Sequence, residues 1–294
     1  MALLTRSALA ALLVAALGCD IIPPPTEPEQ TGWQLQVHAV LLAGADSATV
    51  LLTRVRGSGD GSGIRREAVA GASVRLSGGG VVAELTAGAA GAACGGGFPG
   101  SPPDSSLSAG CYAARIAGGV RAGEPYELRI DLPDGESVLG RTVVPPVPPL
   151  LSPGPGVTIR VPRYGSSSPE DPVALDWLAA PGSRVEAAVN PAPGCEAWIS
   201  AEGSSYGTYS VVLTAAPPAD LRVNGLFCRG PVPPGEYPAE LVLTVFDSTY
   251  TRYARETLGV DQLPAERAAA GITGAVGVFA SAAQARIPVS LAVK

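Results

Sequence analysis

The chain has 294 residues, a formal net charge of −6 and 16% charged residues. An acidic chain without a basic cluster in its sequence argues against a nucleic-acid partner, because phosphate binding needs concentrated Lys and Arg. The 37 glycines and 29 prolines favour many short strands joined by turns over a helical bundle. The length allows two domains of ordinary size, each with its own core.

A secretory signal peptide is predicted at residues 1–18. Arg6 supplies a positive charge, residues 8–17 are apolar, and the small residue Gly18 comes last, an order typical of an export signal. The apolar run is shorter than the about 20 residues that cross a bilayer. Because Cys19 follows directly, the segment resembles the bacterial lipoprotein signal, in which the Cys thiol carries acyl chains such as palmitate. The resemblance implies lipidation of Cys19.

Residues 19–31 are expected to form a lipid-anchored tether. Three consecutive prolines, Pro23 to Pro25, favour an extended spacer, and few side chains here could join a core. Since the sequence lacks a basic cluster, we expect membrane attachment to depend on the lipid. The prediction is a bacterial cell-envelope protein, on the outer membrane in preference to the inner, with its folded part in the periplasm or at the cell surface.

Residues 32–148 are expected to form a first β-sandwich. Odd positions are apolar from Trp33 to Leu41, which is the period of a half-buried strand. Further strands are predicted at residues 48–55, 69–76, 81–86, 111–116, 126–132 and 137–144. Seven short strands over this length are typical of a sandwich. The Pro-rich run at 145–149 ends the unit, because proline cannot donate to a sheet ladder.

Residues 149–294 are expected to form a second β-rich domain of fibronectin-like type. Strands are predicted at residues 157–161, 173–177, 184–189, 197–200, 209–213, 240–246 and 287–293. A short helix is predicted from Leu263 to Ala270, with Gly271 ending it. The predicted fold class is therefore all-β, with two immunoglobulin-like or fibronectin-like sandwiches behind a signal peptide and a Pro-rich tether.

Four cysteines remain once Cys19 is assigned to lipid. They form two local groups, Cys94 with Cys111 and Cys195 with Cys228, and three pairings are open to four cysteines. An oxidising compartment and the grouping by half favour pairing within each group. Each such bridge should contribute about 3 to 4 kcal/mol by restricting the unfolded chain. The sequence contains no CxxC motif and a single histidine, which argues against a metal site.

Three features of the sequence could suggest a catalytic or ligand-binding site, but a structural role explains each of them better. Gly203 to Gly207 matches the G-x-S-x-G elbow, but no His follows Ser205 to serve as its base. The Gly57–Gly63 run lacks the Lys-Ser or Lys-Thr pair of a phosphate loop, so a flexible hairpin loop is favoured. His38 falls on the polar side of its predicted strand, where a surface histidine is the simpler interpretation.

Acidic and aromatic residues of the second domain leave a carbohydrate role open. The pair Glu170–Asp171 suits glycosidase or calcium chemistry, and a solvated loop explains it equally well. Tyr206 and Tyr209, near Trp198, are the best candidates for a surface that binds a glycan or a peptide. Core packing is the more frequent role of such aromatic residues.

The order of several motifs carries a family resemblance. In the first domain, the "GA-x-V-x-L" strand and the later "G-x-Y" and "Y-x-L" strands resemble carboxypeptidase-regulatory-like and transthyretin-like sandwiches. Taken together in their order along the chain, these strands and three later segments are similar to the envelope lipoproteins catalogued as domain of unknown function 4249. The segments are 69–76, 110–112, 126–130, 145–149, 175–177 and 271–279. The resemblance implies an envelope location, often with genes beside TonB-dependent transporters, and it supplies no catalytic residues.

The functional prediction is a lipid-anchored binding or scaffold protein that is not an enzyme and uses no cofactor or metal. A chain with one histidine and no complete triad has few routes to catalysis. Expected partners are the membrane, through the lipid, and an envelope protein such as a TonB-dependent outer-membrane transporter. The alternatives are a carbohydrate-active enzyme or glycan-binding module, and a purely structural spacer.

Overall fold

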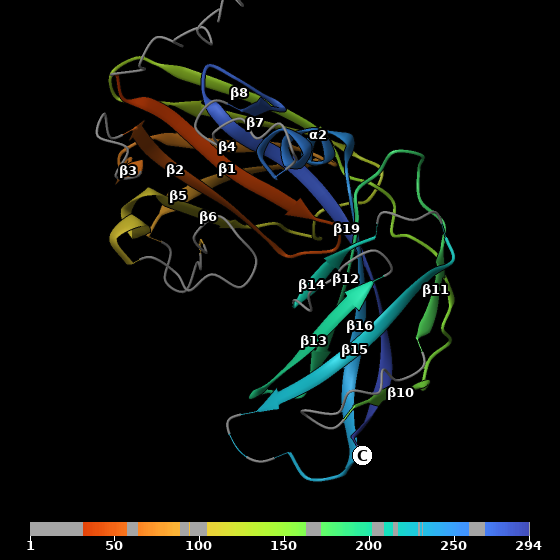
Figure 1. Ribbon diagram of the computed structural model, residues 1–294. Coiled ribbons are helices and arrows are strands. Elements are labelled where there is room, and N and C mark those ends of the chain that lie inside the picture. Colours follow the sequence, from red (N-terminus) through yellow and green to blue (C-terminus); the bar gives the residue numbers. More distant parts are fainter. Residues whose placement is uncertain are drawn as a thin grey trace, which may run out of the picture.

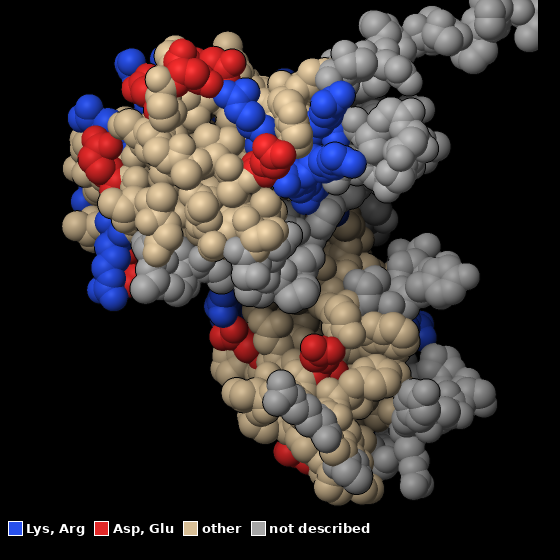
Figure 2. Space-filling model, turned by 90° about the vertical axis from the view of Figure 1, so that its left-hand side faces the viewer, with Lys and Arg blue, Asp and Glu red and all other residues tan. Residues whose placement is uncertain are grey.

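The computed structural model describes two β-sandwiches, which form the upper and lower bodies in Figure 1 and are seen as filled surfaces in Figure 2. The all-β class expected from the sequence is confirmed. The signal peptide, Cys19, the tether, Glu170–Asp171, Ser205 and Tyr206 lie outside the described residues. These residues are 32–57, 64–88, 94, 105–162, 172–201, 209–213, 217–228, 230, 232–258 and 268–293.

The first sandwich is built mainly from the N-terminal half of the chain, with β18 and the start of the last strand added from the C-terminal end. Its strands are hydrogen-bonded in the order β1-β2-β6-β5-β4-β7-β8-β18, with β3 beside β2. β5 pairs with β6 and with β4, so it joins the two sheets. The bounds are β1 Gln34–Leu42, β2 Ser47–Gly57, β3 Ile64–Ala68, β4 Ser73–Gly78, β5 Val81–Ala87, the 3-10 helix η1 Ser105–Gly110, β6 Cys111–Arg115, β7 Pro125–Asp131, β8 Ser137–Val143 and β18 Ile272–Thr273.

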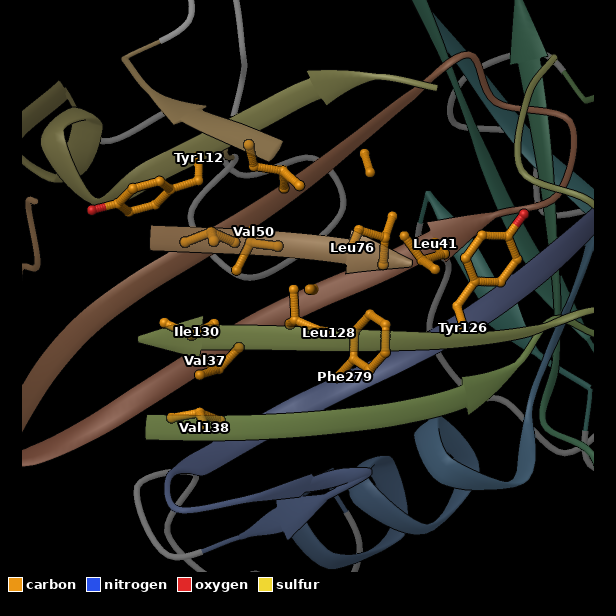
Figure 3. Close-up of a cluster of buried hydrophobic side chains, with 14 of the residues drawn as sticks. Val37, Leu41, Val50, Leu76, Tyr112, Tyr126, Leu128, Ile130, Val138 and Phe279 are labelled. Carbon is orange, nitrogen blue, oxygen red and sulfur yellow. The ribbon is translucent and has the colours of Figure 1, made fainter. Parts of the chain in front are cut away.

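Alternating apolar residues fill the core of this sandwich. On β1 the odd positions Leu35 to Leu41 are buried and the even positions are not, as predicted. Side chains from β4, β7 and β8 meet them from the facing sheet (Figure 3). The buried Tyr112 hydroxyl donates to the Val69 carbonyl and accepts from the Ala72 N–H, both at 3.0 Å. Burial of an aliphatic side chain contributes about 1.5 to 3 kcal/mol, so this core stabilises the unit strongly.

The second sandwich pairs two smaller sheets. One has the order β14-β12-β16-β19 with β10 beside β19, and the other has the order β13-β15-β11-β9. A second cluster of buried apolar side chains lies between them. The bounds are β9 Leu150–Ser152, β10 Thr158–Val161, β11 Val173–Trp177, β12 Val185–Pro191, β13 Cys195–Ala201, β14 Ser210–Val212, β15 Ala219–Cys228, β16 Gly235–Phe246 and β19 Val276–Val293.

The last strand, β19, runs through both sandwiches (Figure 1). Its first part, 276–282, pairs in parallel with β1, and 282–293 pairs with β16. Phe279 therefore lies in the first core and Leu291 in the second. The strand expected at 287–293 is the end of this longer strand, and the range 149–294 is not a separate packing unit, because its segment near Phe279 completes the first sandwich.

The helix is placed differently from the sequence prediction. α2 spans Ser248–Leu258, whereas residues 269–270 form the short strand β17 Ala269–Ala270. Asp247 caps the helix, since its Oδ1 accepts the N–H of Tyr250 at 2.7 Å. Residues 263–267 of the predicted helix lie outside the described residues. The Thr- and Tyr-rich sequence of α2 has strand-like propensity. The cap and the packing against β17 and β19 therefore stabilise the helix over a strand.

The disulfide pairing expected from the sequence is the one in the structure. Cys94 is bonded to Cys111, and Cys195 to Cys228. The second bridge joins residues directly opposite each other on β13 and β15. It ties these two strands together at one end of the sheet β13-β15-β11-β9.

Candidate binding surface

The outward face of the sheet β13-β15-β11-β9 carries large exposed aromatic side chains. On β13, Ala197 and Ile199 are buried in the core, while Trp198 between them is exposed. Phe227 on β15 is exposed as well, and Tyr209 lies exposed just before β14. The exposed fractions are 42% for Trp198, 38% for Phe227 and 60% for Tyr209. We refer to these three residues as the aromatic surface.

A glycine lets two of these rings meet. Trp198 lies opposite Gly225 in the register of β13 and β15. A Cβ at Gly225 would stand 3.3 Å from the Phe227 ring, so the missing side chain leaves room for that ring beside Trp198. The ring centroids are 5.5 Å apart in an edge-to-face arrangement, which is favourable for aromatic pairs. The Cys195–Cys228 bridge, one residue pair from the Glu196–Phe227 pair, fixes the strand register that brings the rings together.

Polar groups flank the rings. The Tyr209 hydroxyl donates a hydrogen bond to the Glu196 carboxylate, and this bond, with the carboxylate's charge, raises the pKa of Tyr209. Ser200 donates to the Asn224 side-chain oxygen at 3.4 Å. The surface thus offers ring faces for stacking next to carboxylate and amide groups for hydrogen bonding, a combination suited to holding a partner.

The sequence predicted part of this surface. Trp198 and Tyr209 were candidates for an exposed aromatic surface against the alternative of core packing, and the structure exposes both of them. Phe227 was missed, because only the register with β13 and the gap at Gly225 bring it to Trp198. Among the described residues, no group of three or more His, Cys, Asp or Glu lies close enough to hold a metal ion.

A second polar site lies at the junction of the two sandwiches. The buried Asp247 carboxylate accepts hydrogen bonds from the Thr142 hydroxyl, from the Ser281 N–H at 3.1 Å and from the Ser281 hydroxyl at 3.2 Å, besides the Tyr250 N–H. Burial raises the pKa of Asp247, and these hydrogen bonds oppose that shift. Because protein donors engage both of its oxygens, this carboxylate holds β8, α2 and β19 together.

A groove of about 600 Å³ opens beside this junction. Its lining includes Tyr126, Thr142 and Asp247, together with an exposed ion pair in which Arg141 Nε lies 3.1 Å from Glu127 Oε2. This groove was not predicted from the sequence, because its lining residues come from β4, β7, β8 and the start of α2. Arg141 and Glu127 pair with each other and Asp247 is held by protein donors, so the aromatic surface is the stronger candidate for partner binding.

His38 lies partly buried on the outward face of β1, the polar side predicted for it. Burial lowers the pKa of His38, and the charge of Arg66 lowers it further. The folded protein therefore holds this side chain neutral more strongly than the unfolded chain does. The structure gives His38 an influence on stability that a fully exposed histidine lacks.

This lowered pKa predicts a pH-dependent loss of stability. As the pH falls below about 6.5, the unfolded chain binds the proton first. The contribution of His38 to the free energy of unfolding is therefore full above that pH and declines below it. His38→Gln should remove this part of the fall in stability with falling pH. Urea unfolding at a series of pH values measures it, and no other histidine interferes because the chain has one. If the free energy of unfolding fell equally steeply with pH in the wild type and in His38→Gln, the prediction would be contradicted.

Comparison with known proteins supplies no family. No family model matches the chain, and no curated protein matches it by sequence. Similar solved structures include Dpr11 IG1 bound to DIP-gamma IG+IG2, with 10% identity, a TM-score of 0.23 and coverage of 89% of this chain and 98% of that one. Drosophila N-cadherin EC1-3 has 11% identity and a TM-score of 0.22, with coverage of 87% of this chain and 64% of that one. The E. coli adhesin CfaE has 7% identity and a TM-score of 0.22, with coverage of 88% of this chain and 87% of that one. Likenesses this weak carry no argument about function.

In the part of the chain that the structure describes, no helix combines the length and the apolar character needed to cross a membrane.

Proposed function

We propose that this protein is a lipid-anchored binding protein of the bacterial cell envelope. In this proposal the chain is exported, acylated at Cys19 and held near the membrane by residues 20–31. The second sandwich then presents its aromatic surface to a partner. The observation that carries the proposal is the exposed, edge-to-face pair of Trp198 and Phe227. Large aromatic side chains are enriched at the centres of binding interfaces.

The proposed partner is another envelope protein, with a TonB-dependent outer-membrane transporter as the first candidate. This choice rests on the resemblance to domain of unknown function 4249 proposed from the sequence motifs, for which no family model gives a match. The proposal assigns no chemistry to the junction carboxylate Asp247, because protein donors engage both of its oxygens. The two disulfides fit the oxidising compartment that export implies.

Replacing Trp198 with alanine should weaken partner capture by at least about 30-fold, as expected for an interface hot spot of about 2 kcal/mol. The measurement is crosslinking and pull-down of the tagged full-length protein from its own envelope, followed by identification of the captured protein. Val82→Ala is the matched control, because Val82 is 60% exposed but lies on the first sandwich. Equal capture by wild type and Trp198→Ala would place the partner elsewhere.

A glycan is the second candidate ligand, favoured by the hydrogen bond that holds Glu196 beside the rings. Aromatic stacking with an adjacent carboxylate suits sugar rings and their hydroxyl groups. Recovery of envelope glycan without protein in the same pull-down, lost in both Trp198→Ala and Glu196→Gln, would favour this candidate over a transporter.

A further inference from the structure

Three arginines, Arg56, Arg65 and Arg66, lie on the β2–β3 hairpin. In the register, Arg56 lies opposite Arg65 and Val55 opposite Arg66, so Arg56 and Arg65 share one face of the hairpin and Arg66 lies on its other face. Arg56, Arg65 and Arg66 are all exposed. Figure 2 looks at the molecule from the side of β3 and shows Lys and Arg surface gathered on the upper body. The absence of a basic cluster inferred from the sequence is therefore corrected by strand pairing.

The charges of these arginines are not neutralised within the described part of the chain. The neighbouring Arg54 contacts Asp134 at 2.6 Å and Glu136 at 3.3 Å, and it faces Glu67 in the register. By contrast, Arg56, Arg65 and Arg66 make no ion pair with any described residue. Like charges opposite each other on paired strands destabilise a sheet, so an anionic partner would offset a cost that the hairpin carries.

The position of the three arginines identifies the anion. Gln34, the first residue of β1, is paired with Val55, which is paired with Arg66. Strands lie about 4.8 Å apart, so the chain enters the fold about 10 Å from Arg66. Residues 20–33 separate that point from Cys19, so the two lie at most about 50 Å apart. The arginines thus lie at the end of the molecule nearest the proposed anchor.

We propose that Arg56, Arg65 and Arg66 form a contact surface for the anionic phospholipid headgroups of the membrane that holds Cys19. Arginine forks bind phosphate oxygens in a bidentate manner. The contact would orient the first sandwich on the membrane and direct the second sandwich away from it. This inference rests on the lipid anchor of the proposed function for its geometry, but the headgroup contact can be measured without the lipid.

The test uses the chain from Asp20 to Lys294, which contains every described strand and cannot be acylated at Cys19. Co-sedimentation is measured with vesicles of phosphatidylcholine, with and without phosphatidylglycerol. We expect binding to the anionic vesicles alone. The triple variant Arg56→Gln/Arg65→Gln/Arg66→Gln should bind about 100-fold more weakly, because each basic residue near an anionic surface contributes about fivefold.

The matched control removes the same charge elsewhere. Arg75→Gln/Arg115→Gln/Arg129→Gln changes three exposed arginines outside the hairpin, and its binding should fall far less. An equal loss in both triple variants, or wild-type binding that is absent or indifferent to phosphatidylglycerol, overturns the proposal. Mass spectrometry of the N-terminal peptide tests the anchor separately: an unacylated Cys19 alongside intact vesicle binding refutes the anchor and leaves the headgroup contact standing.

Discussion

Phe279→Ala should lower the free energy of unfolding by about 4 kcal/mol. The ring is fully buried in the core of the first sandwich (Figure 3) and lies against the backbone of β8, where a Cβ at Gly140 would stand 2.7 Å from it. β19 is held by β1 over 276–282 and by β16 beyond, so the strand cannot move inward to fill the space. The alanine variant therefore keeps most of the cavity.

Urea denaturation followed by circular dichroism measures this loss. Phe227→Ala serves as the matched control, because the Phe227 ring is 38% exposed, and it should cost under about 1 kcal/mol. A loss at Phe279 as small as that at Phe227 would show that β19 does not complete the first core in solution.

Asp247→Ala should destabilise the protein by about 3 kcal/mol. The substitution removes the cap of α2, which contributes about 1 kcal/mol. It also leaves the buried Ser281 N–H without the oxygen that it contacts at 3.1 Å, and an unsatisfied buried donor costs about 1 to 3 kcal/mol. Relief of the carboxylate's own burial, which raises its pKa, offsets a part of these losses.

The comparison is with Asp131→Ala, which breaks an exposed ion pair to Arg129 at 2.9 Å. Such pairs contribute about 0 to 1 kcal/mol, so this variant should unfold close to the wild type. Thermal and urea unfolding of both variants provide the measurement. If the two variants were equally stable, Asp247 would not be the polar link between the sandwiches that the hydrogen bonds indicate.

The strands that the sequence predicted best have one face in a core and one in solvent. β1 is the clearest case, with buried odd positions and half-buried even positions. The start of β19 gives no such signal, because residues from Gly277 to Ala283 are buried in succession. A strand covered on both faces loses the two-residue period. The sequence therefore predicted only the end of this strand, at 287–293.

The candidate site was predictable to the extent that single residues reveal it. Trp198 and Tyr209 could be named, since aromatic residues are few in this chain. Phe227 could not, because strand pairing brings it to Trp198, and the approach of Arg56 to Arg65 likewise depends on pairing. Arg56 and Arg65 stand on either side of a glycine-rich segment, and only the hairpin register makes them neighbours. Asp247 was missed for a similar reason, as its donors come from residues 142, 250 and 281.

The unbroken run of β19 has a mechanical consequence. Tension between an anchored first sandwich and a partner held by the second would travel along one strand instead of through a linker. The ladder between β16 and β19, from Gly235–Val293 to Phe246–Ala282, would carry that load in shear, with its hydrogen bonds strained together. With the proposed anchor in place, such an arm would transmit a pull with little extension and would hold the aromatic surface at a set distance from the membrane.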